Sequence, residues 1–418
     1  MRITFLTFFL TIMAFSLLGQ DLDKIKKEDL VQVSGSLGSM GTYYNGPSER
    51  SPFFWQLQAN LNISTPLLSI PLSFVLSQQQ QAFGYPTQPF NQYGLSPKYK
   101  AVKLHLGYRT MRFSEFSLSG NQFLGAGVEL APKDKMFKYK CLVGRFSKAI
   151  YGDTNDVILG AIPTFERWGW GNHIELGTVA NNVSLLLFKA KDDANSISNL
   201  YDSSAVFKPA ENLIFGITTK QKVNKHLSFD SEIDWSAYTN NTRVQESVLQ
   251  GFSYLNNLGS LFYANSTTTF NKAILANLKY SKKSLGLKFG YRRIDPEYKT
   301  MGSVYLNNDF EDLTSSIAYK FLKNKINFNV TGGLQRNNLK EDKATEMLRR
   351  IYAVAANYVP NNKWNFNLQY SNFNANTQKT LVIMLDTSLV PLSIQNYAQV
   401  TESAGGQIMF NKPTKENI

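Results

Sequence analysis

The chain has 418 residues, of which 43% are hydrophobic and 13% aromatic, with a formal net charge of +13. A basic balance of this size raises nucleic acid as a partner, but the lysines and arginines are scattered singly and form no basic block, which argues against one. The single cysteine, Cys141, excludes an intramolecular disulfide.

The N-terminus reads as an export signal. Arg2 is followed by an uncharged run from Phe5 to Leu18 and then by small and polar residues around Gly19. The alternative is a membrane anchor, but the run is shorter than the roughly 18 residues that an anchor needs. We therefore predict a signal peptide at 1–20 and a single mature domain at 21–418.

Residues 55–63 show the pattern that recurs along the mature chain. Every odd position, beginning with Trp55, is apolar, and every even position, beginning with Gln56, is a neutral amide. Side chains alternate between the two faces of a strand, so this segment predicts a strand with one apolar and one polar face. Its length suits a strand that crosses a bilayer at a tilt, which takes about 9–11 residues.

Three later segments predict hairpins by the same alternation. They are 213–235 with a turn at 222–225, 274–291 with a turn at 281–284, and 350–370 with a turn at 360–363. The turns hold the Asn and Pro residues that tight hairpins favour.

Short and long connections alternate along the chain. We expect short turns near 65–67, 132–135, 178–181, 223–226, 281–284, 321–325 and 360–363, and long polar loops near 78–98, 192–211, 239–272, 294–309, 337–346 and 375–395. The alternation slips between 98 and 132, and a short strand at 113–119 restores it. With that strand the count is about 18, within a range of 14–18, and an even number is usual for bacterial barrels.

Together these features predict an all-β fold, a transmembrane antiparallel up-and-down β-barrel. No stretch past residue 20 is apolar enough for a membrane helix, and only a closed barrel otherwise satisfies the backbone in lipid. The last strand is expected to end at Phe410, and the eight residues after it are either a short tail or the sign of a chain that stops before its natural end.

The mature chain resembles porin-like outer-membrane β-barrel proteins of Bacteroidetes-type bacteria. The resemblance rests on three segments: GNQFLGAGVEL at 120–130, KAKDD at 189–193 and PAENL at 209–213. It implies a fold and a location rather than a substrate.

Catalytic and metal chemistry find little support. The three histidines are His105 and His173 on polar strand faces and His226 in a turn, and no repeated ligand spacing accompanies them. We therefore expect no enzyme, no metal and no cofactor.

The polar strand faces carry the candidate functional residues. By strand parity, we expect a set of charged and imidazole side chains to line the lumen: Lys103, His105, Arg109, Arg167, His173, Glu175, Asp230, Glu232, Asp234, Lys288 and Arg292. Either they line a hydrated pore, or they pair with one another and with inward-folded loops in a plugged barrel. Likewise the acids at 230–234 and the bases Lys288 and Arg292 either set up a transverse field or neutralise each other through loops.

Two aromatic segments leave further alternatives open. In 165–171, two tryptophans share one parity and glycines the other, which predicts a lipid-side aromatic girdle or, alternatively, carbohydrate stacking. The neutral loop at 78–98 either folds into the barrel or contacts a partner.

We therefore expect an exported outer-membrane channel for passive diffusion of small hydrophilic solutes. Its expected partners are outer-membrane lipid and the barrel-assembly machinery. The alternative is a non-conducting structural or accessory barrel of an envelope assembly or secretion complex. A receptor with a folded plug is disfavoured, since only about ten residues separate the expected cleavage site from the first strand.

Overall fold

The structure is a computed structural model of the whole chain. It describes residues 31–46, 53–77, 91–133, 135–150, 163–197, 207–248, 251, 255–256, 258–385 and 388–411, without the side chains of 379–385 and 388–395. The predicted signal peptide at 1–20 lies outside the described residues. Within them, no helix is long and apolar enough to cross a membrane.

The described chain forms nineteen strands in one antiparallel sheet. The strands are β1 Gln32–Tyr43, β2 Phe53–Ser64, β3 Leu68–Ser77, β4 Gln92–Leu95, β5 Lys98–Tyr99, β6 Val102–Arg112, β7 Ser119–Leu130, β8 Phe137–Ser147, β9 Arg167–Gly177, β10 Asn181–Asp192, β11 Glu211–Lys222, β12 Leu227–Thr239, β13 Thr268–Lys282, β14 Leu285–Ile294, β15 Phe310–Phe321, β16 Ile326–Asn337, β17 Thr345–Asn361, β18 Trp364–Leu385 and β19 Ser388–Phe410.

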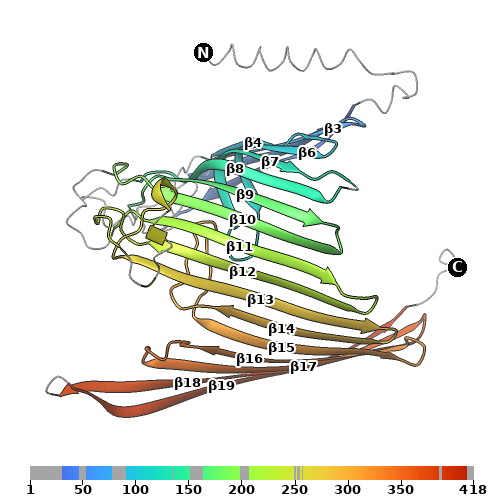
Figure 1. Cartoon of the computed structure of the whole chain (residues 1–418). Helices are drawn as coiled ribbons and strands as arrows, with labels where there is room; N and C mark the ends of the chain where they lie inside the picture. Colours follow the sequence, from blue (N-terminus) through green and yellow to red (C-terminus); the bar gives the residue numbers. More distant parts are fainter. Residues whose placement is uncertain are drawn as a thin grey trace.

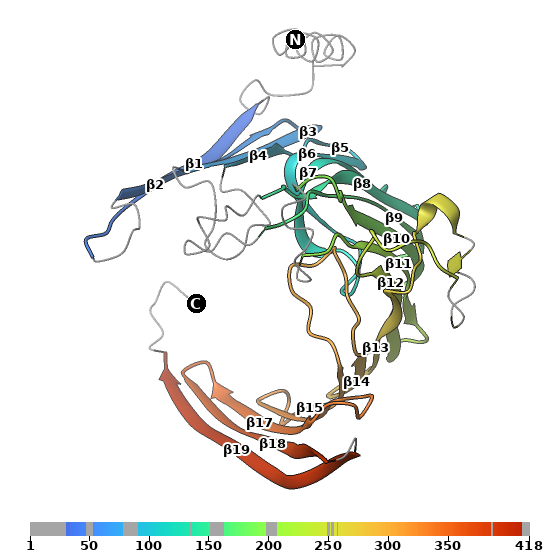
Figure 2. The same cartoon turned by 90° about the vertical axis from the view of Figure 1, so that its left-hand side faces the viewer.

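Apart from β4 and β5, consecutive strands pair with each other, so the strands follow one another up and down around the barrel. The short strands β4 and β5 both pair with β3 on one side and β6 on the other, so they occupy one place in the sheet. Counted this way, the described strands fill eighteen places, which lies within the predicted range of 14–18. The sheet curves round until β1 and β19 form its two edges (Figure 2).

The connections sort by length onto the two ends of the barrel. Short turns such as 178–180, 223–226 and 283–284 lie at one end, and the long segments lie at the other (Figure 1). The N-terminal end of β1 and the C-terminal end of β19 both lie at the short-turn end. Gln32 pairs with Ser64 and Phe410 with Trp364, and each of these partners is next to a short turn.

The two faces of the sheet have opposite chemistry. On β14 to β16 the face turned away from the barrel axis carries exposed apolar side chains such as Phe289, Leu313 and Ile317. The neighbouring positions, turned to the interior, carry residues such as Lys288 and Ser316. This is the reverse of a soluble β-protein, whose apolar face is turned inward.

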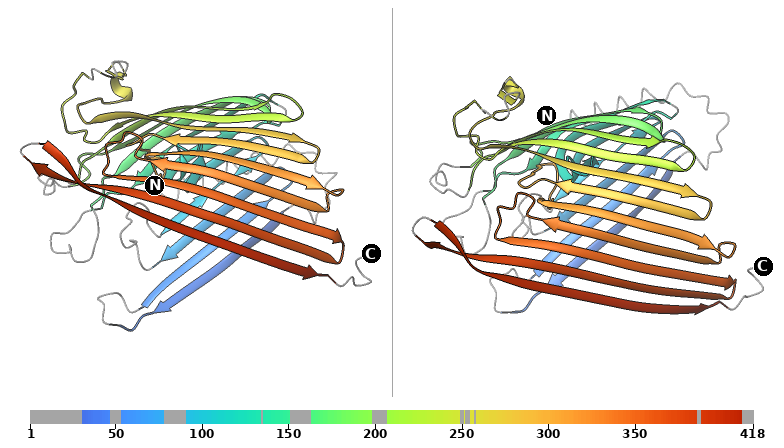
Figure 3. Two further views of the ribbon diagram at one scale, coloured as in Figure 1. Left: turned by 90° about the horizontal axis from the view of Figure 1, so that it is seen from below. Right: turned by 60° about the horizontal axis from the view of Figure 1, so that its bottom comes forward.

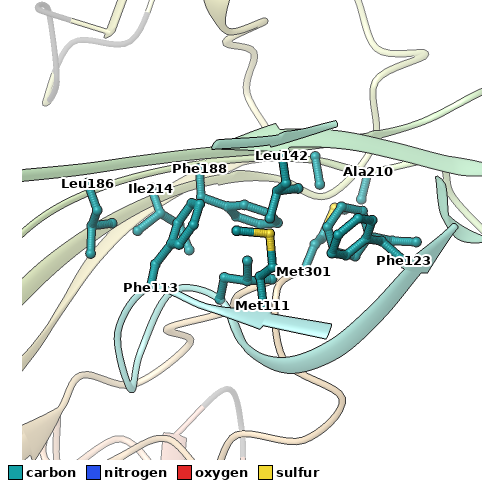
Figure 4. Close-up of a cluster of buried hydrophobic side chains, with 12 residues drawn as sticks. Met111, Phe113, Phe123, Leu142, Leu186, Phe188, Ala210, Ile214 and Met301 are labelled. Atoms are coloured by element: carbon teal, nitrogen blue, oxygen red, sulfur yellow. The ribbon is translucent and has the colours of Figure 1, made fainter. Parts of the chain in front are cut away.

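Two segments fold into the barrel and pack on its inner wall. The segment 113–118, between β6 and β7, and the β14–β15 connection at 295–309 lie within the curve of the sheet (Figure 2). Around them a buried cluster joins Met111, Phe113 and Met301 to wall residues of β7, β8, β10 and β11 (Figure 4).

A third segment folds against the outer wall instead. Part of the β12–β13 connection, with the 3-10 helix η5 (Gly259–Leu261), lies outside the sheet (Figure 2). Leu255 and Phe262 pack there on Leu213 and Ala237 of β11 and β12. This connection therefore covers apolar wall near the loop end.

The prediction of a strand at 113–119 is wrong. Residues 113–118 form bends, and Ser119 begins β7. Their alternation of apolar and polar residues is strand-like, but the side chains and backbone contact distant residues of β12 and the 295–309 connection rather than a neighbouring strand. The place that this strand was expected to fill is taken by β4 and β5.

Two predicted loops are also shorter than expected. The end of 78–98 forms β4 and the start of β5, while 78–90 lies outside the described residues. The predicted loop at 375–395 is instead the outer part of the β18–β19 hairpin, which extends beyond the other strands (Figure 3). Residues 380–384 and 389–394 are largely apolar or β-branched, a composition that favours strands over loops.

Candidate functional site

The candidate site is the inner wall of the barrel. Among the predicted residues, Glu232 and Asp234 on β12 face Thr218 and Gly216 across the β11–β12 pair, and contact the inward segment 113–118. Because alternate residues share a face, these contacts fix which parity of each paired strand faces the interior.

Glu232 holds the backbone of the inward segment. Its Oε1 accepts hydrogen bonds from the backbone N–H groups of Glu115 at 2.8 Å and Phe116 at 3.0 Å. These N–H groups belong to a bend with no strand partner, so the carboxylate supplies the acceptor that the fold otherwise lacks.

Asp234 is fully buried beneath the same segment. Ser114 donates its hydroxyl to Asp234 Oδ2 at 2.7 Å and lies 2.5 Å from the Ser117 hydroxyl. A buried carboxylate is costly unless it is hydrogen-bonded, so the serine hydroxyl stabilises Asp234 as well as positioning the segment.

Arg292 on β14 completes the attachment from the other side. Its guanidinium forms an ion pair with Glu115 at 3.0 Å and lies over the rings of Phe116 and Phe310. Two of the predicted acids, Glu232 and Asp234, and one predicted base, Arg292, therefore contact the same segment. Asp230 and Lys288 do not take part in these contacts.

The 295–309 connection also packs on the segment 113–118. Tyr298 is buried and donates its hydroxyl to the Phe116 carbonyl at 3.1 Å. Burial raises the pKa of the Tyr298 phenol well above its usual range, and the nearby Asp234 and Glu232 raise it further. The phenol therefore stays protonated and able to donate.

Small residues on the wall make room for this packing. A Cβ at Gly171 would lie 2.5 Å from the Phe113 ring, and one at Gly144 would lie 2.8 Å from the Phe123 ring. The glycines that alternate with Trp168 and Trp170 thus face the interior, and Trp168 is 50% exposed on the outer face. This placement is that of an outer-wall aromatic rather than of a stacking platform in the lumen.

The predicted histidines differ in what they contact. His105 is buried, with Nε2 at 2.6 Å from Glu129 Oε1 and Nδ1 at 3.3 Å from the Ser96 hydroxyl. His173 stacks on Phe113 with 5.7 Å between the ring centroids. Among the described residues, no group of three or more His, Cys, Asp or Glu side chains is placed to hold a metal.

The remaining predicted residues are spread along the wall. Arg167 forms a bidentate pair with Asp192 at the loop end, at 2.7 and 3.1 Å, and Arg109 donates to the Ser73 hydroxyl at 2.7 Å. At the short-turn end, Glu175 pairs with Lys138 at 2.6 Å, Asp230 pairs with Lys279 at 2.9 Å, Lys103 lies 3.7 Å from Glu129, and Lys288 faces Lys279 across the β13–β14 pair.

Several partners were missed in the sequence. Glu129 on β7 and Lys138 on β8 both occupy inward positions of their strands, so the alternation of faces could have predicted them. Glu115 and Ser114 lay in a segment that was predicted as a strand, so parity could not.

No family model matches the chain, and no curated protein matches it. Solved structures of similar architecture include Acinetobacter baumannii OccAB3, at 9% identity over 91% of this chain and 98% of that chain, with a TM-score of 0.39. Pseudomonas aeruginosa OccK2 (OpdF) in complex with glucuronate is 8% identical over 91% and 97%, with a TM-score of 0.40. Acinetobacter baumannii OccAB4 is 10% identical over 91% and 97%, also with a TM-score of 0.40.

Likeness at this level assigns neither a substrate nor a residue role, and the functional argument rests on the chain's own geometry. The resemblance to Bacteroidetes-type proteins stays a prediction.

Proposed function

We propose that the protein is an outer-membrane, porin-like channel for passive diffusion of small hydrophilic solutes. The observation that carries the proposal is the inverted sheet, with apolar side chains exposed outside and polar side chains inside. A soluble protein rarely exposes apolar patches of more than a few hundred Å², whereas a lipid-facing wall requires them.

Aromatic residues at the short-turn end support the membrane placement. Trp364, Phe366 and Phe410 form a contiguous outward group, with 4.7 Å between the centroids of Trp364 and Phe410. Exposed Tyr319 and Phe321 continue it on β15. Such rings suit the boundary between lipid and water, where they contact acyl chains and headgroups together.

The polar wall of β15–β19 supports a wet lumen. Its interior positions include Thr331, Asn357 and Gln369, and in the described residues no buried hydrophobic cluster covers them. Polar side chains without a packed cover are stable when water reaches them. In this proposal, solutes pass along this wall, opposite the inward segment 113–118.

A structural or accessory barrel is the second candidate. The observation that favours it is the packing of 113–118 and 295–309 on the opposite wall, which fills part of the interior. It predicts a folded barrel that does not conduct.

Planar-bilayer conductance of refolded protein tests the proposal. Folding is checked first by the mobility shift between heated and unheated samples in SDS gels. Discrete conductance steps, together with swelling of protein-containing liposomes in small uncharged sugars, are the expected result. Correctly folded protein that gives neither would overturn the channel and favour the accessory barrel.

A further inference from the structure

A lysine-lined cavity opens at the short-turn end of the barrel, apart from the contacts of segment 113–118. It has a volume of about 800 Å³ and lies among three adjacent short turns, near 65–67, 100–101 and 131–133. Among the described residues, its charged lining consists of four lysines and one glutamate: Lys98, Lys100, Lys103, Lys133 and Glu129.

The lysines of the β5–β6 pair face the interior rather than lipid headgroups. Lys98 of β5 and Lys103 of β6 pair with each other, as do their neighbours Tyr99 and Val102. Tyr99 and Val102 are exposed apolar residues on the outer face, so alternation turns both lysines inward. Basic residues in turns commonly contact lipid phosphates, but this role does not explain lysines that face the interior.

Lys98 and Lys103 also form a like-charge pair directly across two strands. Side chains at such positions have Cβ atoms about 4.5–5.5 Å apart, and like charges there are destabilising. The carboxylate of the cavity does not fully offset them. Glu129 places the same oxygen 2.6 Å from His105 Nε2 and 3.7 Å from Lys103 Nζ, and among the described residues no ion pair is formed by Lys98. An anion between the two ammonium groups would remove the repulsion.

We propose that this cavity binds a phosphate group, on free phosphate or on a small phosphorylated solute. Lysine ammonium groups are compact, strongly hydrated charges that suit phosphate as point-charge partners. Several of them on a recessed surface raise the local concentration of anions at the mouth. This site adds a substrate class to the proposed channel. It rests on the proposed function only for the route by which the solute reaches the cavity.

Binding is measured on folded protein in detergent by calorimetry, with inorganic phosphate and glycerol 3-phosphate as separate probes. We expect saturable binding that the double substitution K98Q/K103Q weakens about tenfold or more, because each lysine loses a charge-assisted contact. The matched control is K323Q/K325Q, which removes the same charge from the short turn at 322–325, and it should bind like the parent.

The probes separate the sources of the phosphate group. Binding of both assigns the site to the phosphate itself, and binding of the ester alone assigns it to organic phosphates. No saturable binding of either probe, equal loss in both double variants, or equal affinity for malonate would each overturn the proposal.

Single-channel conductance measured in chloride separates a failure of the phosphate site from a failure of the proposed channel. A protein that conducts but binds neither probe overturns only the phosphate site. A folded protein that binds phosphate but does not conduct overturns only the channel.

Discussion

The wall of β6–β14 and the wall of β15–β19 belong to one sheet but have different interiors. The first is covered by the segments 113–118 and 295–309, which bury Phe123, Phe188 and Ile294. The second exposes its polar side chains to the lumen. The same alternation of residues along a strand therefore supports a packed wall and a wet wall, depending on whether a loop covers it.

The difference teaches what the interior acids do. Glu232 and Asp234 lie on the covered wall and accept hydrogen bonds from the inward segment. Asp312 lies at the start of the uncovered wall, and its partner there is the Gln335 side chain. Interior charge thus attaches a loop on one side and contributes to a polar surface on the other.

A matched truncation offers the largest test of this contrast. Ile294 is fully buried beneath Phe116 and Tyr298, whereas Ile351, also on an interior position, is 40% exposed. Ile294→Ala should lower the free energy of unfolding by about 2–5 kcal/mol, since it leaves a cavity. Ile351→Ala should cost well under half as much. Denaturant unfolding of both variants in the same lipid measures the difference, and equal losses would show that the two walls are not distinct.

A second pair tests the faces of the uncovered wall. Ile317 and Ala318 are neighbours near the middle of β15, with Ile317 on the lipid side and Ala318 on the lumen side. Ile317→Lys should cost about 2–4 kcal/mol of unfolding free energy, because it places a charge in hydrocarbon. Ala318→Lys should cost little. The opposite order would contradict the inverted sheet.

Interior glycines give a smaller effect. A Cβ at Gly171 would press on Phe113 at 2.5 Å, whereas one at Gly333 would meet its nearest atom at 3.5 Å. Gly171→Ala should cost about 1–3 kcal/mol through overpacking, and Gly333→Ala should be close to neutral. Urea titration monitored by tryptophan fluorescence compares them. A neutral Gly171→Ala would indicate that the inward segment is loosely held.

An effect of similar size is expected on the attachment of the inward segment. Ser114→Ala removes the hydroxyl donor to Asp234 and should cost about 1–3 kcal/mol. Ser371→Ala on the uncovered wall is the control. If the segment narrows the channel, Ser114→Ala should also make single-channel currents noisier while Ser371→Ala leaves them unchanged. Identical current traces would show that the segment does not move in response to the loss.

Much of the barrel wall could be predicted from the sequence, because strand alternation and turn chemistry depend on neighbouring residues. The hairpins of β11–β12, β13–β14 and β17–β18 were predicted with turns within two residues of those observed. The alternation in 165–171 also placed its tryptophans outward and its glycines inward, as in β9. The strand predicted at 113–119 was wrong, because residues with a strand-like alternation form hydrogen bonds with residues more than a hundred positions away.

The sequence by itself determined most of the strands, their two faces and the alternation of short and long connections. These properties depend on a period of two residues and on turn chemistry, both of which act over a few neighbours. Only the tertiary structure decided that β4 and β5 share one place, that 113–118 and 295–309 cover one wall, and that three separate turns enclose a cavity lined by Lys98 and Lys103. Those depend on which residues the curvature of the sheet brings together, and no local pattern records that.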